Sequence, residues 1–323
     1  MADGSKKVAK NLGELLEGLP KNWGKWGPDD ELGSLNYLTP EQVLKGVATI
    51  KSGKTFTLQI QIGNPKGDPI WPGRRGSHRV NVLDRSHFAC GRHPHIPGDM
   101  EYVDDMMIMY LQGSTQYDAL GHVWFDGTIW NGYSADSTIG GTTKASVLPI
   151  AEKGVVGRGV LIDMARFRGK KHLDRGETFD HNDLLAAAKH QGVEIRKRDV
   201  LIIRTGWIGS FYERTAEDFY KDFNEPGLVF SPELVRWFHE MEIPNLVTDT
   251  IANEVTVDPT TGFIVTLHNA LMRNLGVAFT EIILPDGLAE DCAADGQWDF
   301  LYVAAPLKVF EGSGAPVNPV VIK

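Results

Sequence analysis

Cysteine is scarce in this sequence, and its scarcity excludes two kinds of site. Only Cys90 and Cys292 occur among the 323 residues, far apart and without the Cys-x-x-Cys spacing. A disulfide framework or a cysteine-based zinc site needs more cysteines at closer spacing, so we expect neither. Each cysteine is instead predicted to be a buried structural thiol.

Long apolar runs are also missing. No stretch approaches the roughly 18 apolar residues that a membrane-spanning helix needs. The first ten residues, "MADGSKKVAK", lack the hydrophobic core of a secretory signal peptide. We therefore expect a cytoplasmic protein that has no membrane partner.

Positive charge is in deficit. The chain carries 33 Lys and Arg against 42 Asp and Glu, a net charge of −9. Binding to a nucleic-acid backbone depends on clustered Lys and Arg, so a nucleic-acid partner is not expected. A short basic cluster lies among glycines at Arg74, Arg75, His78 and Arg79. This cluster indicates an exposed loop, with binding of an anionic substrate as the alternative.

The composition is otherwise that of a folded globular protein, with 42% hydrophobic and 23% charged residues. The length suffices for one large domain, and no linker or internal repeat divides it. Two stretches rich in Gly and Pro, 63–76 and 90–98, predict long loops, which often carry function.

Strand and helix patterns alternate along the chain. Short apolar runs predict strands, and cap residues followed by periodic apolar positions predict helices. Strands are expected within 55–62, 158–164, 199–205, 245–250, 277–284 and 299–310, and helices within 39–47, 180–192, 231–241 and 266–276. This alternation predicts a single α/β domain with a mixed, partly parallel sheet.

The stretch "LQGSTQYDALGHVWFDG", residues 111–127, has the spacing of a metal site. Asp118 and His122 lie four residues apart and can converge on one cation where the chain turns. Gln116 points to the same side as Asp118 if the segment is extended, and its amide oxygen is a weaker ligand. A hydrogen-bonded polar turn is the alternative for this pattern.

A second candidate pair lies downstream. His268 falls in the predicted helix 266–276, and Glu281 falls among apolar residues of the predicted strand 277–284. A buried glutamate is costly unless it is paired or bound to a cation. The alternatives are a glutamate on the exposed face of an edge strand and an ordinary helix histidine.

Together these segments resemble the cyclase family of metal-dependent hydrolases, which includes bacterial kynurenine formamidase, isatin hydrolase and trans-dienelactone hydrolase. The family signature His-x-Gly-Thr-His-x-Asp-x-Pro-x-His aligns with residues 112–122. Asp118 and His122 match it, whereas Gln112 and Gln116 replace histidines and Leu120 replaces proline. Residues 22–41, 157–169, 199–207 and 247–250 are also similar to family segments, so the similarity covers nearly the whole chain.

The resemblance implies a single domain over residues 1–323 with the swivelling β/α/β, cyclase-like fold. It also implies that His268 and Glu281 join the motif at the metal. We expect one divalent ion, Mn²⁺ or Zn²⁺, held by Gln116, Asp118, His268 and Glu281. His122 is either a further ligand or the group that transfers the proton, so Asp118 and His122 are the predicted catalytic residues. The two glutamines should weaken a second metal position.

Aromatic residues near the motif suit a small planar substrate. The predicted substrate-binding residues are Gln112, Tyr117, Trp124, Phe125, Trp71, Trp207 and Asp249. Burial in the core is the alternative for each aromatic residue, and Asp249 could equally cap a turn.

The predicted function is hydrolysis of an amide or lactone bond through a metal-activated water. A metal-free binding protein and a metal-dependent lyase or isomerase are the alternatives. The resemblance also implies a homodimer or homotetramer. Residues 1–38 are expected to form an extension packed on the body or on a partner subunit, through Trp23 and Trp26.

Overall fold

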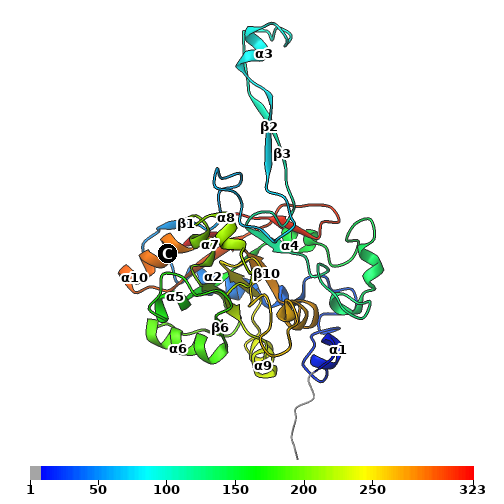
Figure 1. Ribbon diagram of the computed structural model, residues 1–323, viewed down its shortest axis with the longest axis vertical. Helices are drawn as coiled ribbons and strands as arrows, with labels where there is room; N and C mark the ends of the chain where they lie inside the picture. Colours follow the sequence, from blue (N-terminus) through cyan, green and yellow to red (C-terminus); the bar gives the residue numbers. More distant parts are fainter. Residues whose placement is uncertain (1–8) are drawn as a thin grey trace, which may run out of the picture.

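The computed structural model describes residues 9–323, which are built around a nine-stranded mixed sheet (Figure 1). Its strand order is β1-β13-β11-β5-β7-β9-β10-β4-β12. The strands are β1 (Thr55–Thr57), β2 (His78–Leu83), β3 (Asp104–Ile108), β4 (Gln116–Asp118), β5 (Val155–Asp163), β6 (Thr178–Phe179), β7 (Val200–Arg204), β8 (Gly227–Leu228), β9 (Asn245–Thr248), β10 (Ala278–Glu281), β11 (Asp299–Ala304), β12 (Gly314–Pro316) and β13 (Val320–Ile322). The mixed α/β fold is therefore as predicted.

Most helices are short and lie between these strands. The α-helices are α1 (Leu12–Leu15), α2 (Pro40–Val47), α3 (Arg85–Ala89), α4 (Val147–Lys153), α5 (Met164–Phe167), α6 (His181–Gln191), α7 (Trp207–Phe211), α8 (Ala216–Tyr220), α9 (Pro232–Glu240) and α10 (Asp286–Asp295). The 3₁₀ helices are η1 (Gly33–Tyr37), η2 (Trp130–Gly132) and η3 (Ala135–Thr138), and η4 (His268–Arg273) is a π-helix.

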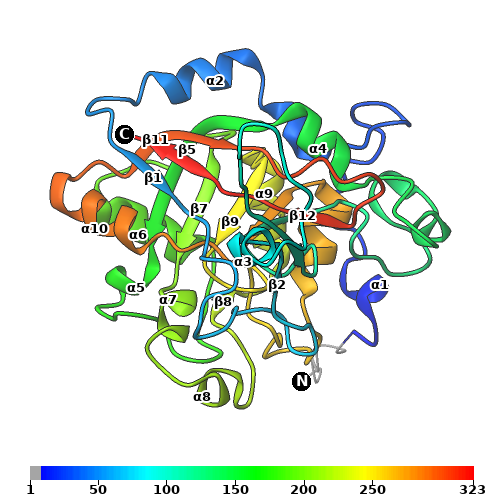
Figure 2. The same ribbon diagram turned by 90° about the horizontal axis from the view of Figure 1, so that it is seen from above.

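The centre of the sheet is parallel and covered on both faces. Strands β5, β7, β9 and β10 pair in parallel, as the alternation of strands and helices predicts. Successive residues of β7 point to opposite faces, so Ile203 joins the core under α6 and α9, whereas Ile202 joins the core that contains residues of α4 and α10. Figure 2 shows β5, β7 and β9 side by side in the view from above.

The predicted boundaries of α6 and α9 are confirmed by their caps, whereas Thr39 makes no capping hydrogen bond before α2 and the helix predicted over 266–276 is the shorter π-helix η4. Asp180 accepts from backbone N–H groups at the start of α6, and Gly192 ends that helix with a left-handed backbone at φ 72°. Ser231 caps α9. The strand predicted over 55–62 is shorter than expected, because only Thr55–Thr57 pair with β13 and the chain then makes a single bridge at Gln59.

Strand β4 brings the motif into the sheet. It pairs antiparallel with β10 on one side and with β12 on the other. Gln116 is opposite Glu281 in this register. The two segments that carry the candidate ligands, far apart in sequence, therefore lie side by side.

The described part of the N-terminal segment contacts the body of the same chain. The backbone N–H of Asn22 donates to the carbonyl of Asn274, and the indole of Trp23 donates to the carbonyl of Arg273 at 2.8 Å. Trp26 packs against Trp130. These contacts tie the segment to η4, the helix that carries His268.

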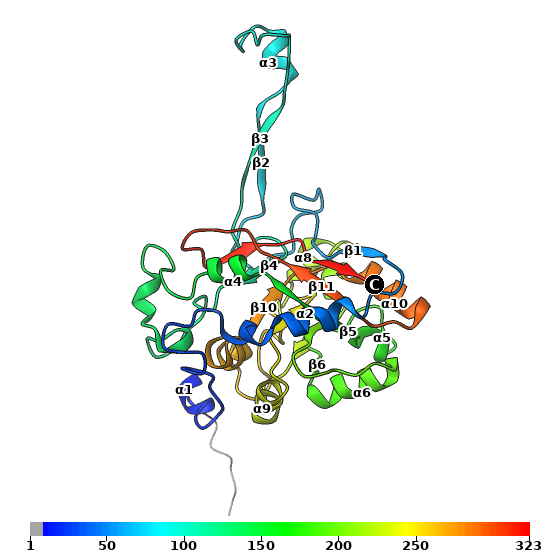
Figure 3. The same cartoon turned by 180° about the vertical axis from the view of Figure 1, so that it is seen from behind.

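A long hairpin stands away from the body. Strands β2 and β3 pair only with each other, and α3 and the predicted 90–98 loop lie at their far end (Figures 1 and 3). Cys90 lies there and is exposed, so the prediction that both thiols are buried is wrong for Cys90 and holds for Cys292. No helix among residues 9–323 is long and apolar enough to cross a membrane.

Candidate metal centre

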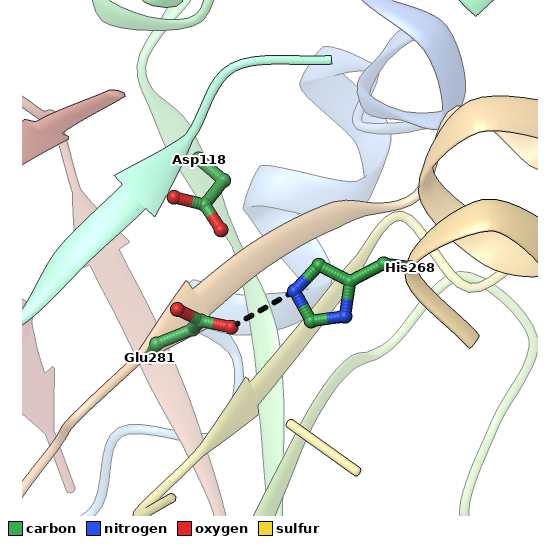
Figure 4. A group of neighbouring side chains, drawn as sticks. All are labelled: Asp118, His268 and Glu281. Atoms are coloured by element: carbon green, nitrogen blue, oxygen red, sulfur yellow. Dashed lines mark ion pairs between the residues drawn. The ribbon is translucent and has the colours of Figure 1, made fainter. Parts of the chain in front are cut away.

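Three buried side chains from three separate elements converge beside β4 and β10. Asp118 ends β4, Glu281 ends β10, and His268 begins η4 (Figure 4). One ligand atom from each lies within 4.8 Å of the other two, and each residue is at most 5% exposed. Two carboxylates and one imidazole in this arrangement are suitable ligands for a divalent cation.

The extended backbone of β4 explains which motif residues reach this centre. Side chains alternate along a strand, so Gln116 and Asp118 share one face and Tyr117 faces the other. Tyr117 is fully buried, and its hydroxyl donates to Asn245 Oδ1 at 2.8 Å. Gln116 instead donates its amide to Glu281 Oε2 at 2.7 Å.

His268 is oriented by Glu254, a residue that the sequence analysis did not identify. Its Nδ1 lies 2.7 Å from Glu254 Oε1, and Glu254 also accepts the backbone N–H groups of Leu267 and His268. Nε2 then points toward Glu281 Oε1 at 3.3 Å. A carboxylate behind a histidine fixes the ring and leaves the other nitrogen free to bind a metal.

The charges of this cluster are strongly coupled. Burial, together with the nearby Asp118 carboxylate, raises the pKa of Glu281 to about 7. Burial alone would lower the pKa of His268, but its contacts with Glu254 and Glu281 outweigh that effect and raise it to about 10. Without a cation, therefore, protons must offset the negative charge concentrated here.

Two buried oxygens at the centre lack hydrogen-bond partners. Gln116 Oε1 and Asp118 Oδ1 are both inaccessible to solvent and unpaired. An unpaired buried acceptor is unfavourable unless something positive binds it. A divalent cation bound by Asp118, His268 and Glu281, with the Gln116 oxygen as a fourth ligand, would satisfy both atoms.

His122 follows Asp118 after a tight turn. Its backbone N–H donates to the carbonyl of Ala119 at 2.9 Å. Gly121 allows this turn, since a Cβ there would lie 3.0 Å from the carbonyl oxygen of Lys144. Burial lowers the pKa of His122, with partial compensation from Asp118, so the imidazole is neutral at pH 7.

A cavity of about 210 Å³ gives access to the centre. Asp118, His122, His268 and Glu281 line it, together with Trp71, Arg74, Val123, Ile251, Ala252 and Val265. This cavity is smaller than the roughly 300–1,000 Å³ of typical ligand pockets. A larger hollow of about 1170 Å³ lies between the N-terminal segment and residues 262–264 and contains none of the metal-ligand candidates.

The backbone around the centre is strained. Asn253, Val265 and Ile282 all have positive φ, at 55°, 46° and 58°. This region is unfavourable for β-branched residues, and such outliers concentrate at functional sites. The Thr115 hydroxyl donates a hydrogen bond to the Ile282 carbonyl at 2.6 Å. The side-chain amide of Asn253 donates to the carboxylate of Glu281.

Of the predicted substrate-binding residues, Trp71 lines the cavity and three others are internal. Trp207 is buried against Phe219 in an aromatic cluster. Asp249 accepts hydrogen bonds from the backbone of Thr205 and Gly206, which is a capping role. Tyr117 faces the core, as described above.

The remaining predicted substrate-binding residues do not line the cavity. The Gln112 side chain donates to Ser313, away from the ligand cluster. Trp124 is exposed beside His122 in a neighbouring hollow. Phe125 stacks under the guanidinium of Arg273. The structure thus brings together Gln116, Asp118, His122, His268, Glu281 and Trp71.

Comparisons with known proteins identify the family of this chain. A family model described as "Putative cyclase" matches residues 56–255. A solved structure described as a novel cyclase is 34% identical, with a TM-score of 0.85, and the match covers 94% of this chain and 100% of that one. The chain therefore belongs to this cyclase family, as the resemblance implied. No curated protein matches the chain.

Two more distant structures share the fold. Isatin hydrolase A from Labrenzia aggregata is 19% identical, with a TM-score of 0.57, over 87% of this chain and 97% of that one. A protein from Bacillus stearothermophilus described as a predicted metal-dependent hydrolase is 14% identical, with a TM-score of 0.50, over 83% and 97%. The cyclase-like fold is thus shared with hydrolases.

Proposed function

We propose that this protein is a metal-dependent hydrolase that opens an amide or lactone bond in a small cyclic or aromatic substrate. The observation that carries the proposal is the convergence of Asp118, His268 and Glu281 at the end of a cavity. The distant structural similarity to hydrolases supports the reaction class.

Asp118, His268 and Glu281 would hold one divalent ion, with Gln116 Oε1 as a neutral fourth ligand. Three oxygens and one nitrogen suit Mn²⁺, whereas the general order of affinities favours Zn²⁺. Bound there, such an ion would polarise a carbonyl and lower the pKa of water. His268 is already turned toward this position by Glu254.

His122 lines the cavity and is assigned the proton transfer. It is not one of the three clustered ligands. Its lowered pKa leaves a neutral imidazole, which can accept a proton from attacking water and return it to the leaving nitrogen or oxygen. Trp71 would form an apolar wall beside the substrate.

The test is a substrate screen with mass detection. Purified protein loaded with Mn²⁺ or Zn²⁺ is incubated with formamides, cyclic imides and lactones, with Asp118→Ala as the control. A product heavier by one water, absent with the variant, supports the proposal. A product of unchanged mass indicates an isomerase, and turnover by Asp118→Ala at the wild-type rate would contradict the assigned centre.

A further inference from the structure

Arg74 is a cation that faces the candidate metal centre. It lines the cavity with Asp118 and Glu281, and its positive charge acts on both Glu281 and His122. The only hydrogen bond of its side chain among residues 9–323 is from Nη1 to the backbone carbonyl of Gln112, at 3.0 Å. It forms no ion pair with any described carboxylate.

The loop that carries Arg74 is held in place. The Arg74 backbone N–H closes a turn onto the carbonyl of Trp71 at 3.1 Å. Asp68 accepts from the backbone N–H groups of Gly63 and Ser77, which pins both ends of this loop. The guanidinium is therefore positioned before any ligand arrives, which reduces the entropy lost on binding.

The charged side chains on the cavity wall indicate which kind of ligand the site would bind. The two carboxylates that line the cavity, Asp118 and Glu281, would both bind the divalent ion, so neither is left to pair with the guanidinium of Arg74. A partly buried guanidinium without an anion is unfavourable, and its planar donors match a carboxylate.

We propose that Arg74 binds a carboxylate of the substrate, so that the amide or lactone opened here is a small organic anion. This inference rests on the proposed function and adds the class of substrate. The guanidinium and the metal position lie on the walls of one cavity of about 210 Å³. The scissile carbonyl and the carboxylate must therefore belong to one compact molecule.

The test uses benzoate and benzamide, which have nearly the same shape and differ in charge. Binding of each is measured by calorimetry to metal-loaded wild-type protein, Arg74→Gln and Arg75→Gln. Arg75 is exposed and does not line the cavity, which makes it a matched control. Metal content is measured on the same samples.

We expect Arg74→Gln to weaken benzoate binding at least about tenfold with its metal content unchanged, because a charge-assisted hydrogen bond is lost. Benzamide binding and Arg75→Gln should stay at wild-type values. Unchanged benzoate binding in Arg74→Gln, or no preference of the wild type for benzoate, would overturn the inference. Absence of metal from all samples would instead contradict the proposed function. The difference in benzoate binding between wild type and Arg74→Gln would then test the inference on the metal-free protein.

Discussion

Gln116 and Glu281 face each other across the β4–β10 pair, and the amide of Gln116 donates to the carboxylate of Glu281 at 2.7 Å. The glutamine thereby orients one of the candidate ligands, and its own buried oxygen, Oε1, has no hydrogen-bond partner. The residue that stands where the family signature has histidine is therefore available as a neutral ligand in the proposed centre.

Replacing Gln116 with histidine should strengthen metal binding. An imidazole is a better ligand than a neutral amide oxygen, so we expect Gln116→His to bind Zn²⁺ at least about tenfold more tightly. Gln112→His is the matched control, because the Gln112 side chain contacts Ser313 rather than the cluster. Competition with a chromogenic chelator measures both affinities. Equal gains in the two variants would show that the sequence motif, not this geometry, decides affinity.

Glu254→Gln should weaken the metal site without removing a ligand. Loss of the carboxylate behind His268 typically lowers metal affinity about 10–100-fold. Glu225 is a fully buried control, since it accepts the backbone N–H of Ile251 rather than contacting His268, and burial raises the pKa of its carboxyl well above the usual value. Glu225→Gln should therefore bind metal as the wild type does. The same chelator assay checks both, and wild-type affinity in Glu254→Gln would argue against the orienting contact.

His122 should be needed for turnover and not for metal. In His122→Ala we expect the metal content of the wild type and a fall in kcat of about 10²–10⁴, the usual contribution of a general acid–base group. Elemental analysis and kinetics on the same preparation separate the two roles. Loss of the metal together with activity would make His122 a ligand instead.

The metal-free protein should lose stability as pH rises from 5 to 8. The pKa of Glu281, raised to about 7, exceeds the ordinary 4.5, so the folded state holds more protons than the unfolded state between these values. His268, with its pKa raised to about 10 from 6.5, acts in the same direction above pH 6.5. Where the folded state binds more protons, unfolding becomes easier as pH rises.

Melting temperatures of the chelator-treated protein at pH 5 and pH 8 check this linkage. We expect a lower Tm at pH 8, and stabilisation by added Mn²⁺ or Zn²⁺ that grows with pH, since a cation replaces the protons. Glu281→Gln should reduce the slope. A Tm that rises between pH 5 and pH 8 without metal would contradict the charge arrangement.

The central fold could be predicted because its signals are local. The Asp180 and Ser231 caps mark the starts of α6 and α9, and the apolar runs of β5 and β7 mark strands covered on both faces. The predicted ligands also meet, since Gln116 and Asp118 share a strand face.

The features that could not be predicted depend on contacts between residues that are separated in the sequence. Glu254 becomes important only because a loop returns it to His268, fourteen residues away. Arg74 was expected in an exposed loop, with binding of an anionic substrate as the alternative, and only the structure shows that it lines the cavity. Trp207 and Tyr117 are aromatic residues near functional segments, yet the directions of their side chains put them in the core. The β2–β3 hairpin likewise has no sequence signal to show that it stands away from the body.

The most direct test of the metal centre is the metal content of the purified protein by elemental analysis, beside Asp118→Ala. The arrangement of Asp118, His268 and Glu281 predicts about one Mn²⁺ or Zn²⁺ per chain in the wild type and loss of that ion in the variant. No bound metal in the wild type, even after dialysis against both ions, would contradict the account.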